Sequence, residues 1–109
     1  MAALTDRQVK ITGTTIPLGA ASAGGDTVKP GDRRIVLVRN GGGSPINVTI
    51  VVPGNDKYGN ARPDIVRAVA AGATEAFGPF PADLADSVDG LIDITYSGVT
   101  SVTVDALTV

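Results

Sequence analysis

A regular alternation of apolar and polar residues marks the stretch INVTIVV, residues 46–52, near the middle of the chain. Every second position from Ile46 is isoleucine or valine, whereas Asn47 and Thr49 occupy the first two alternate positions. Successive side chains of a strand point to opposite faces of a sheet. The pattern therefore predicts a strand with one buried and one solvated side.

The stretch before it, RIVLVRN at residues 34–40, is apolar at both alternating sets of positions. Ile35 and Leu37 would share one side of a strand, and Val36 and Val38 would share the other. Continuous apolar strands are typical of sheets that are covered on both faces. We therefore predict a central strand that is buried on two sides.

Further strands are expected at short intervals, separated by turns rich in glycine and proline. They cover Arg7 to Thr12, a short stretch around Val28, two strands that meet near Ala71-Gly72, and a closing pair, Leu91 to Ser97 and Ser101 to Val109, around Ser97-Gly98. A short helical turn is expected around Pro81 to Asp86. Seven or eight short antiparallel strands in one domain predict an all-β sandwich or jelly-roll-like fold.

One segment of this series also has helical features. Pro63 to Ala71 is rich in alanine, and proline is tolerated at the start of a helix. However, Val66, Ala68 and Ala70 alternate equally well, and Gly72 limits the length. These observations favour a strand.

The first 25 residues differ from the rest of the chain. Their strand pattern is weaker, and Pro17 to Gly25 is small and uncharged, which suggests a flexible connection. We expect residues 1–25 to form an N-terminal arm and residues 26–109 to form the sandwich body. Val9 and Ile11 would then be available to contact a partner, although they would also suit an ordinary edge strand.

Composition agrees with a β-rich fold and removes several kinds of chemistry. Valine, isoleucine and threonine make up 33 of the 109 residues, and residues branched at the β carbon favour strands. The chain has no cysteine and no histidine, which excludes disulfides, thiolate metal sites, a cysteine nucleophile and a serine–histidine triad. No pair of carboxylates stands out for glycoside hydrolysis. We expect neither an enzyme nor a bound cofactor.

The charges are spread along the chain, and their net value is −2. This gives no basic patch for nucleic acid or for an anionic membrane. No apolar run approaches the roughly 18 residues that a membrane-spanning helix needs, and the N-terminus has no hydrophobic signal core. We expect no nucleic-acid partner and no membrane partner.

Three glycines, Gly41 to Gly43, raise the question of a phosphate-binding loop. Such a loop needs a helix whose N-terminal amides face the anion, but Ser44-Pro45 and a clear strand follow these glycines. Asn40-Gly41 instead favours the backbone conformations of a hairpin turn. We interpret the stretch as a hairpin connection.

Two groups of charged residues have simple interpretations. Asp83, Asp86, Asp89 and Asp93 lack the ligand spacing of a calcium loop, so solvated carboxylates are expected rather than a metal site. Arg33 and Arg34 would point to opposite sides of an extended chain. We expect these two and Arg39 to pair with neighbouring carboxylates.

The segment EAFGPFPADL, residues 75–84, concentrates both phenylalanines and two prolines. Phe77 and Phe80 would fill the core, with Phe80 closing one end of the sandwich. Alternatively, the rigid Pro79-Phe80-Pro81 unit presents an apolar knob to a partner. Both interpretations stay open at this point, so Pro79, Phe80 and Pro81 join Val9 and Ile11 as candidate partner contacts.

From about Gly24 to Leu107 the chain resembles a family of small capsid decoration, or cement, proteins of tailed bacteriophages. The likeness rests on four motifs in order: Asp26-Thr27, the strand ending in Asn40-Gly41-Gly42, the Gly78-Pro79-Phe80-Pro81 corner, and the closing pair Thr95 to Val104. Each motif alone is common in β proteins. Their order and spacing give the resemblance its specificity.

The resemblance implies a β-sandwich that binds the outside of an assembled capsid and stabilises it. The partner would be the major capsid protein, and the chain would form a homo-oligomer, with a trimer as one arrangement. It would be made in the host cytoplasm and act on the exterior of the virion. Two alternatives remain: another virion component, such as a head–tail joining or tail protein, and a non-viral adhesion or carbohydrate-binding sandwich.

Overall fold

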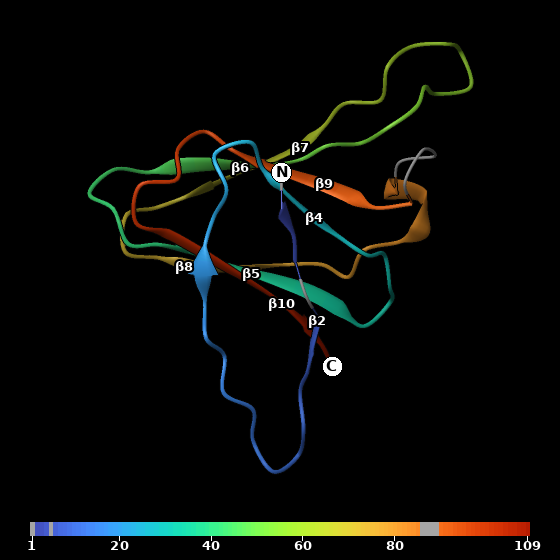
Figure 1. Ribbon diagram of the computed structural model, residues 1–109. Helices are drawn as coiled ribbons and strands as arrows, with labels where there is room; N and C mark the ends of the chain where they lie inside the picture. The colour runs from blue at the N-terminus through green and yellow to red at the C-terminus, as the bar shows by residue number, and fades with distance from the viewer. Residues whose placement is uncertain (1, 5, 86–89) are drawn as a thin grey trace.

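Two β-sheets packed face to face form the computed structural model, which describes residues 2–4, 6–85 and 90–109 (Figure 1). The expected all-β sandwich is confirmed. The strands are β1 (Ala2–Ala3), β2 (Asp6–Gln8), β3 (Gly19–Ala20), β4 (Asp26–Val28), β5 (Arg34–Asn40), β6 (Ile46–Ile50), β7 (Ile65–Val69), β8 (Thr74–Phe77), β9 (Ile92–Tyr96) and β10 (Val102–Thr108). One 3-10 turn, η1 (Ala82–Leu84), lies within the segment expected to be helical.

The two sheets have different strand orders. The first sheet runs β1-β4-β9-β6-β7, and the second runs β2-β10-β5-β8, with β3 also paired to β10. Neighbouring strands are antiparallel, except that β1 is parallel to β4 and β2 is parallel to β10. The strand expected between Pro63 and Ala71 is therefore present as β7, which pairs with β6.

Most connections cross from one sheet to the other. Between the described strands from β3 onward, only β6 and β7 follow one another in the same sheet. The predicted hairpins around Asn40-Gly41 and Ser97-Gly98 are therefore wrong, since β5 and β6 lie in different sheets, as do β9 and β10. Residues of a turn favour a reversal of the chain, but they do not determine which sheet receives the next strand.

The core lies between the inward faces of the two sheets. Its buried residues are almost all branched aliphatic side chains, as the composition suggests, and removing them from water provides the main driving force for folding. They are Ala21, Val28, Val36, Val38, Val48, Ile50, Val69, Phe80, Ile92, Ile94, Val102, Val104 and Ala106.

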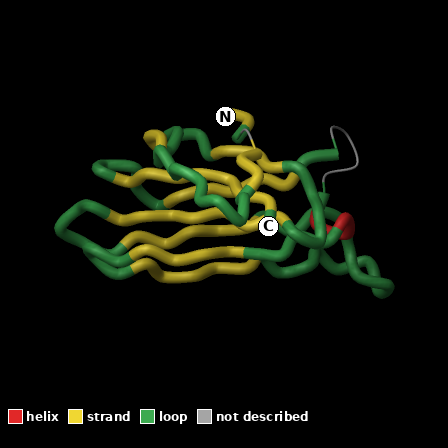
Figure 2. The backbone as a smooth tube through the Cα atoms, turned by 90° about the horizontal axis from the view of Figure 1, so that it is seen from below, coloured by secondary structure: helices red, strands yellow, loops and turns green. Residues whose placement is uncertain are grey.

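The strand β6 has the two-sided character that its sequence predicts. Val48 and Ile50 face the core and are buried, whereas Asn47 lies on the solvent side. Figure 2, which shows the molecule from below, displays the strands of the second sheet side by side.

The strand β5 differs from its prediction. Its central position is confirmed, because it lies between β10 and β8. Val36 and Val38 are fully buried, but Ile35 and Leu37 lie on the outer side and are half-buried. Within the described chain the sandwich has two layers, and no further sheet or helix covers this outer side (Figure 1). Burial on both sides was therefore the wrong expectation.

The N-terminal segment is built into both sheets. Ala2 and Ala3 pair with β4, and β2 pairs with β10. After Val9 the chain leaves the sandwich and returns at β3, and Ala21 is part of the core. Instead of an arm of 25 residues, the described part of this segment has paired strands and one projecting loop, residues 9–18 (Figure 1).

Gly78 is required by the close approach of two chain segments. Its φ is +135°, and a Cβ atom there would lie 2.6 Å from the carbonyl oxygen of Arg34 and 3.2 Å from the Cα of Ile35. Only glycine accepts this combination of positive φ and crowding without strain. The corner after β8 can therefore pass close to β5.

Candidate interaction surface

No group of three or more acidic side chains within the described ranges is placed to hold a metal ion. In the same part of the chain no helix is long and apolar enough to cross a membrane. The surfaces of the molecule are therefore the features to compare with the candidate partner contacts.

The glycine-rich stretch is held in place by Asn40. This side chain is fully buried, and its Nδ2 donates to the carbonyl oxygens of Ser44, at 2.8 Å, and Val69, at 3.1 Å. Its Oδ1 accepts a hydrogen bond from the amide of Gly42 at 3.0 Å. Gly41 is also required, since a Cβ there would lie 2.9 Å from the carbonyl oxygen of Ser101. The stretch is a crossing between the sheets rather than a phosphate cradle.

The acidic segment that contains Asp83 is hydrogen-bonded to the long loop between β6 and β7. Asp86 and Asp89 lie outside the described residues. Asp83 accepts a 2.6 Å bond from Nη1 of Arg62, whose Nη2 donates to the carbonyl oxygens of Pro53 and Asp83. Arg62 thus fixes the base of the loop between β6 and β7, which extends far from the body in Figure 1.

Phe80 is not a surface knob. It is 1% exposed, and its backbone pairs with Gly31, which donates to the Phe80 carbonyl oxygen at 2.8 Å. Pro79 and Pro81 on either side are exposed. The candidate contact at Phe80 is therefore corrected: its side chain closes the core, because the crossing at Gly78 turns it inward.

Val9 and Ile11 lie at the start of the projecting loop. Val9 is 37% exposed and its amide donates to the Thr108 carbonyl oxygen, so it still belongs to the edge of the second sheet. Ile11 is 105% exposed. The loop is closed by a bond from the Lys10 amide to Oγ1 of Thr14 at 2.9 Å. The two candidates are thus close in sequence, but the side chain of Ile11 is far more exposed than that of Val9.

The outer side of the second sheet carries a surface that sequence reasoning did not select. Arg33, Ile35, Leu37 and Arg39 alternate along β5 and its start, opposite to the buried Val36 and Val38. The amide of Val109 donates to the carbonyl oxygen of Arg33, so the pairing with the β10 segment continues past the end of β5.

Neighbouring strands extend this surface on both sides of β5. The strand register adds Thr103, Asp105 and Leu107 from β10, Thr74 and Ala76 from β8, and Arg7 from β2. We call this set, together with the β5 row, the arginine-rimmed face. Its signal in the sequence was the apolar second side of β5, which the sequence alone could not distinguish from coverage by another layer.

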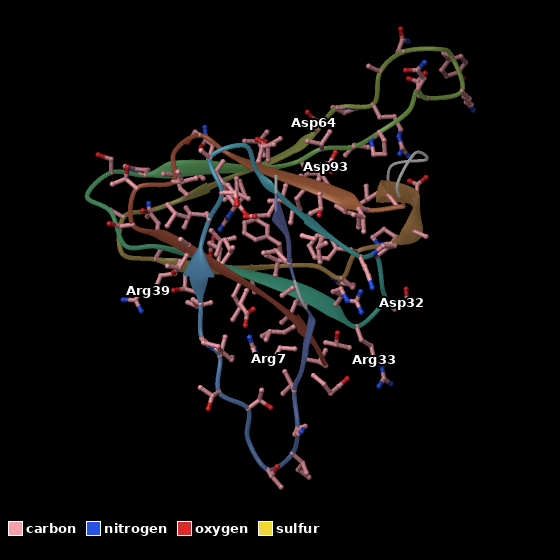
Figure 3. All side chains as sticks on the ribbon, in the orientation of Figure 1. Arg7, Asp32, Arg33, Arg39, Asp64 and Asp93 are labelled. Carbon is pink, nitrogen blue, oxygen red and sulfur yellow. The ribbon has the colours of Figure 1, made fainter. Side chains whose placement is uncertain are left out.

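Three arginines and one carboxylate define the charge of the arginine-rimmed face. Arg7 Nε lies 3.0 Å from Oδ2 of Asp105, and Asp105 is 8% exposed. Arg33 and Arg39 are exposed, and no carboxylate in the described ranges pairs with either, contrary to expectation. Figure 3 shows the three arginines directed outward from the second sheet.

A second apolar feature lies where the edges of the two sheets meet. Ile65 and Val66 of β7 and Phe77 of β8 line an open groove of about 360 Å³. Arg67 bridges it, with Nε 2.8 Å from Oε1 of Glu75 on the other sheet. This ion pair places charge on an edge that would otherwise invite strand pairing.

A buried polar pair joins β4 to β9. Oη of Tyr96 donates to Oδ2 of Asp26 at 2.8 Å, and Asp26 is 1% exposed. Burial, together with the hydrogen bond and the negative charge of Asp26, raises the pKa of the Tyr96 phenol well above its usual range. The phenol is therefore held neutral and serves as the hydrogen-bond donor to Asp26.

Comparisons of the chain with models of protein families, with curated proteins and with solved structures find no match. The resemblance to decoration proteins therefore stays a prediction.

Proposed function

We propose that this chain is a structural protein of a tailed bacteriophage that binds the outside of the assembled capsid and stabilises it. The observation that carries the proposal is the order and spacing of the four motifs between Gly24 and Leu107. The proposal assigns no enzymatic step and no cofactor to the chain.

The positions of these motifs in the fold support reading them as one set. Asp26 of the first motif and Tyr96 of the last are bonded to each other. Asn40 of the second anchors the crossing from β5 to β6, and Gly78 of the third allows the close approach to Arg34. Motifs that hold the junctions of one sandwich are expected to recur together in chains with that sandwich.

The proposed mechanism is linkage. A protein that binds the assembled shell but not the free capsid subunit shifts the equilibrium toward the shell, by an amount that grows with its concentration relative to its Kd. Homo-oligomers, including a trimer, would present several contacts at once and bind more strongly than single copies. The partner is the major capsid protein, reached on the virion exterior after synthesis in the host cytoplasm.

Binding to shells tests this function. Expanded, DNA-free shells of the phage that encodes the chain should co-sediment with the purified protein, and cryo-electron microscopy should show it on the outer surface. Shells saturated with the protein should also disassemble at a higher temperature. Protein that stays in the supernatant, or that localises to the tail or neck of virions, would contradict the proposal. Saturable glycan binding at low micromolar Kd would favour an adhesion module instead.

A further inference from the structure

The two outer faces of the sandwich are unlike each other. On the first sheet, Thr49 of β6 lies opposite Thr95 of β9, and Asn47 is exposed, so the middle of this face is polar, although Val66 of β7 opposite Thr49 is apolar and exposed. On the second sheet, β5 places isoleucine and leucine at the equivalent positions. A sheet with one side solvated normally alternates between apolar and polar residues, so the second sheet is the exception.

The apolar centre of the arginine-rimmed face consists of Ile35 and Leu37 of β5, both half-buried, and the exposed Ala76 of β8, which lies opposite Leu37. Leu107 of β10 lies opposite Ile35 but is itself buried, so the apolar centre ends at β5 on that side. Exposed apolar areas with polar rims are typical of interaction sites. Arginine is enriched in such sites because its planar guanidinium group binds carboxylates through paired hydrogen bonds.

We propose that the arginine-rimmed face is the docking surface of this protein, and that its occupant is an acidic protein surface with a flat apolar centre. Charge complementarity selects this occupant: Arg33 and Arg39 are exposed, and no carboxylate in the described ranges pairs with them, while the one carboxylate of the face, Asp105, is already paired with Arg7. The assignment deepens the proposed function, since the capsid exterior would then supply the acidic surface.

The projecting loop extends the same surface. Residues 9–18 leave the sandwich from β2 and return at β3, both of which pair with β10. Figure 1 shows this loop extending below the second sheet, on the side of the arginine-rimmed face. Ile11 and Ile16 of this loop are both exposed. A partner bound to the face would meet the loop along one border.

Other occupants fit less well. Nucleic acid offers phosphates but no aliphatic surface to cover Ile35 and Leu37, and the face has no aromatic side chain on which bases could stack. A second copy would have to offer an acidic surface of its own, so the contact would join unlike faces. Such a contact gives a ring or an open chain depending on its rotation, and sedimentation of the free protein detects either.

The first arm of the test maps the chemistry of the face without any assumption about function. The probe is 1-anilinonaphthalene-8-sulfonate, which combines an apolar body with an anionic group. Titration into the isotopically labelled full-length protein should shift amide resonances of Ile35, Leu37 and Ala76, and the variant Arg33→Glu/Arg39→Glu should lose the effect. Shifts confined to the groove at Ile65 and Phe77, or no saturable binding, would overturn the proposal.

The second arm uses the expanded shells. Arg33→Glu/Arg39→Glu should bind them at least tenfold more weakly, whereas the control Lys29→Glu/Lys57→Glu, which changes the net charge equally at exposed sites away from the face, should bind like the wild type. Equal binding of both variants would overturn the docking surface and leave the capsid function standing. If the wild type binds no shell, the capsid function fails, and the dye titration still decides the chemistry of the face.

Sedimentation of the free protein tests the remaining occupant, a second copy of the chain. Self-association that Arg33→Glu/Arg39→Glu abolishes would assign the face to a second copy and overturn the proposal. Substitutions at exposed positions are expected to leave the melting temperature within two or three degrees of that of the wild type. A variant that meets this criterion is folded, so its loss of binding is due to the changed surface.

Discussion

Tyr96 and Asp26 illustrate how a buried acid is kept in a valine-rich core. The carboxylate accepts bonds from the phenol of Tyr96, at 2.8 Å, and from the amide of Ser22, at 3.4 Å. A buried charge without donors would cost several kcal/mol, so these bonds make its position tolerable. The same arrangement couples stability to alkaline pH.

The variant Tyr96→Phe should lower the free energy of unfolding by about 2 kcal/mol at pH 7, because it removes a donor from a buried carboxylate. In the unfolded chain the phenol ionises near pH 10, whereas in the folded protein its pKa is raised. The stability that the raised pKa provides is therefore complete below about pH 10 and declines above it.

Urea denaturation at pH 7 and at pH 10.5 checks this expectation. The difference between the wild type and Tyr96→Phe should narrow at the higher pH. Tyr58→Phe is the matched control, since Tyr58 is exposed at the tip of the long loop. A difference that stays the same at both values would mean that ionisation of the Tyr96 phenol is not linked to unfolding.

Asn40 is the other polar residue that organises its surroundings. The variant Asn40→Ala would leave the carbonyl groups of Ser44 and Val69 and the amide of Gly42 without their partner. We expect a loss of about 3 kcal/mol in the free energy of unfolding. Asn47→Ala, on the solvent side of β6, should cost less than about 0.5 kcal/mol. Equal effects in thermal denaturation would show that the buried amide does not anchor the crossing.

At the scale of elements, the N-terminal strands β1 and β2 should contribute more to the stability of the fold than the projecting loop, residues 9–18. Deleting residues 2–8 removes β1 and β2 and leaves Asp105 without Arg7. Exposing the edges of β4 and β10 and a nearly buried carboxylate should cost several kcal/mol. The double variant Ile11→Ser/Ile16→Ser should melt within two or three degrees of the wild type, since both side chains are exposed.

Circular dichroism followed during heating measures both effects. A truncated protein as stable as the full chain would mean that the strand pairings of residues 2–8 contribute little. A large loss in the double variant would mean that the loop packs on the sandwich.

The strands themselves could be predicted from the sequence, because period-two patterns depend only on local residues. The prediction for residues 34–40 matches β5, and that for 46–52 differs from β6 by two residues. The pairing of the strands could not be predicted in this way. Asn40-Gly41 has the composition of a hairpin turn, yet Asn40 at the end of β5 pairs with Val102 of β10, which is far further along the chain.

The candidate surface was predicted only in part. The exposure of Ile11 and the burial of Phe80 both depend on how the chain returns after Gly13 and Gly78, which is a tertiary property. The apolar outer side of β5 was visible as a pattern, but a pattern gives the side of a strand and not what covers it. The charges around it come from strands that are distant in sequence and meet only in the folded sheet.

At the scale of the whole molecule, the placement of the chain ends determines how the fold would respond to force. β2 and β10 are parallel, and the chain enters β2 from the N-terminus and leaves β10 at the C-terminus. Tension on the two termini therefore pulls these strands in opposite directions along their length. All bonds between them are loaded together, in shear, instead of one after another.

A different direction of pulling should find a weak point in the same molecule. Handles at positions 43 and 100 would load β6 and β9 from the end where Val48 pairs with Tyr96, so that their bonds open one at a time. The chain has no cysteine of its own, and a Cβ at Gly43 meets nothing within 4 Å, so Gly43→Cys/Thr100→Cys can carry the linkers. Single-molecule extension should give a higher rupture force from the termini than from these handles. A sandwich with this property would be mechanically stiff along one axis and easily peeled apart along another.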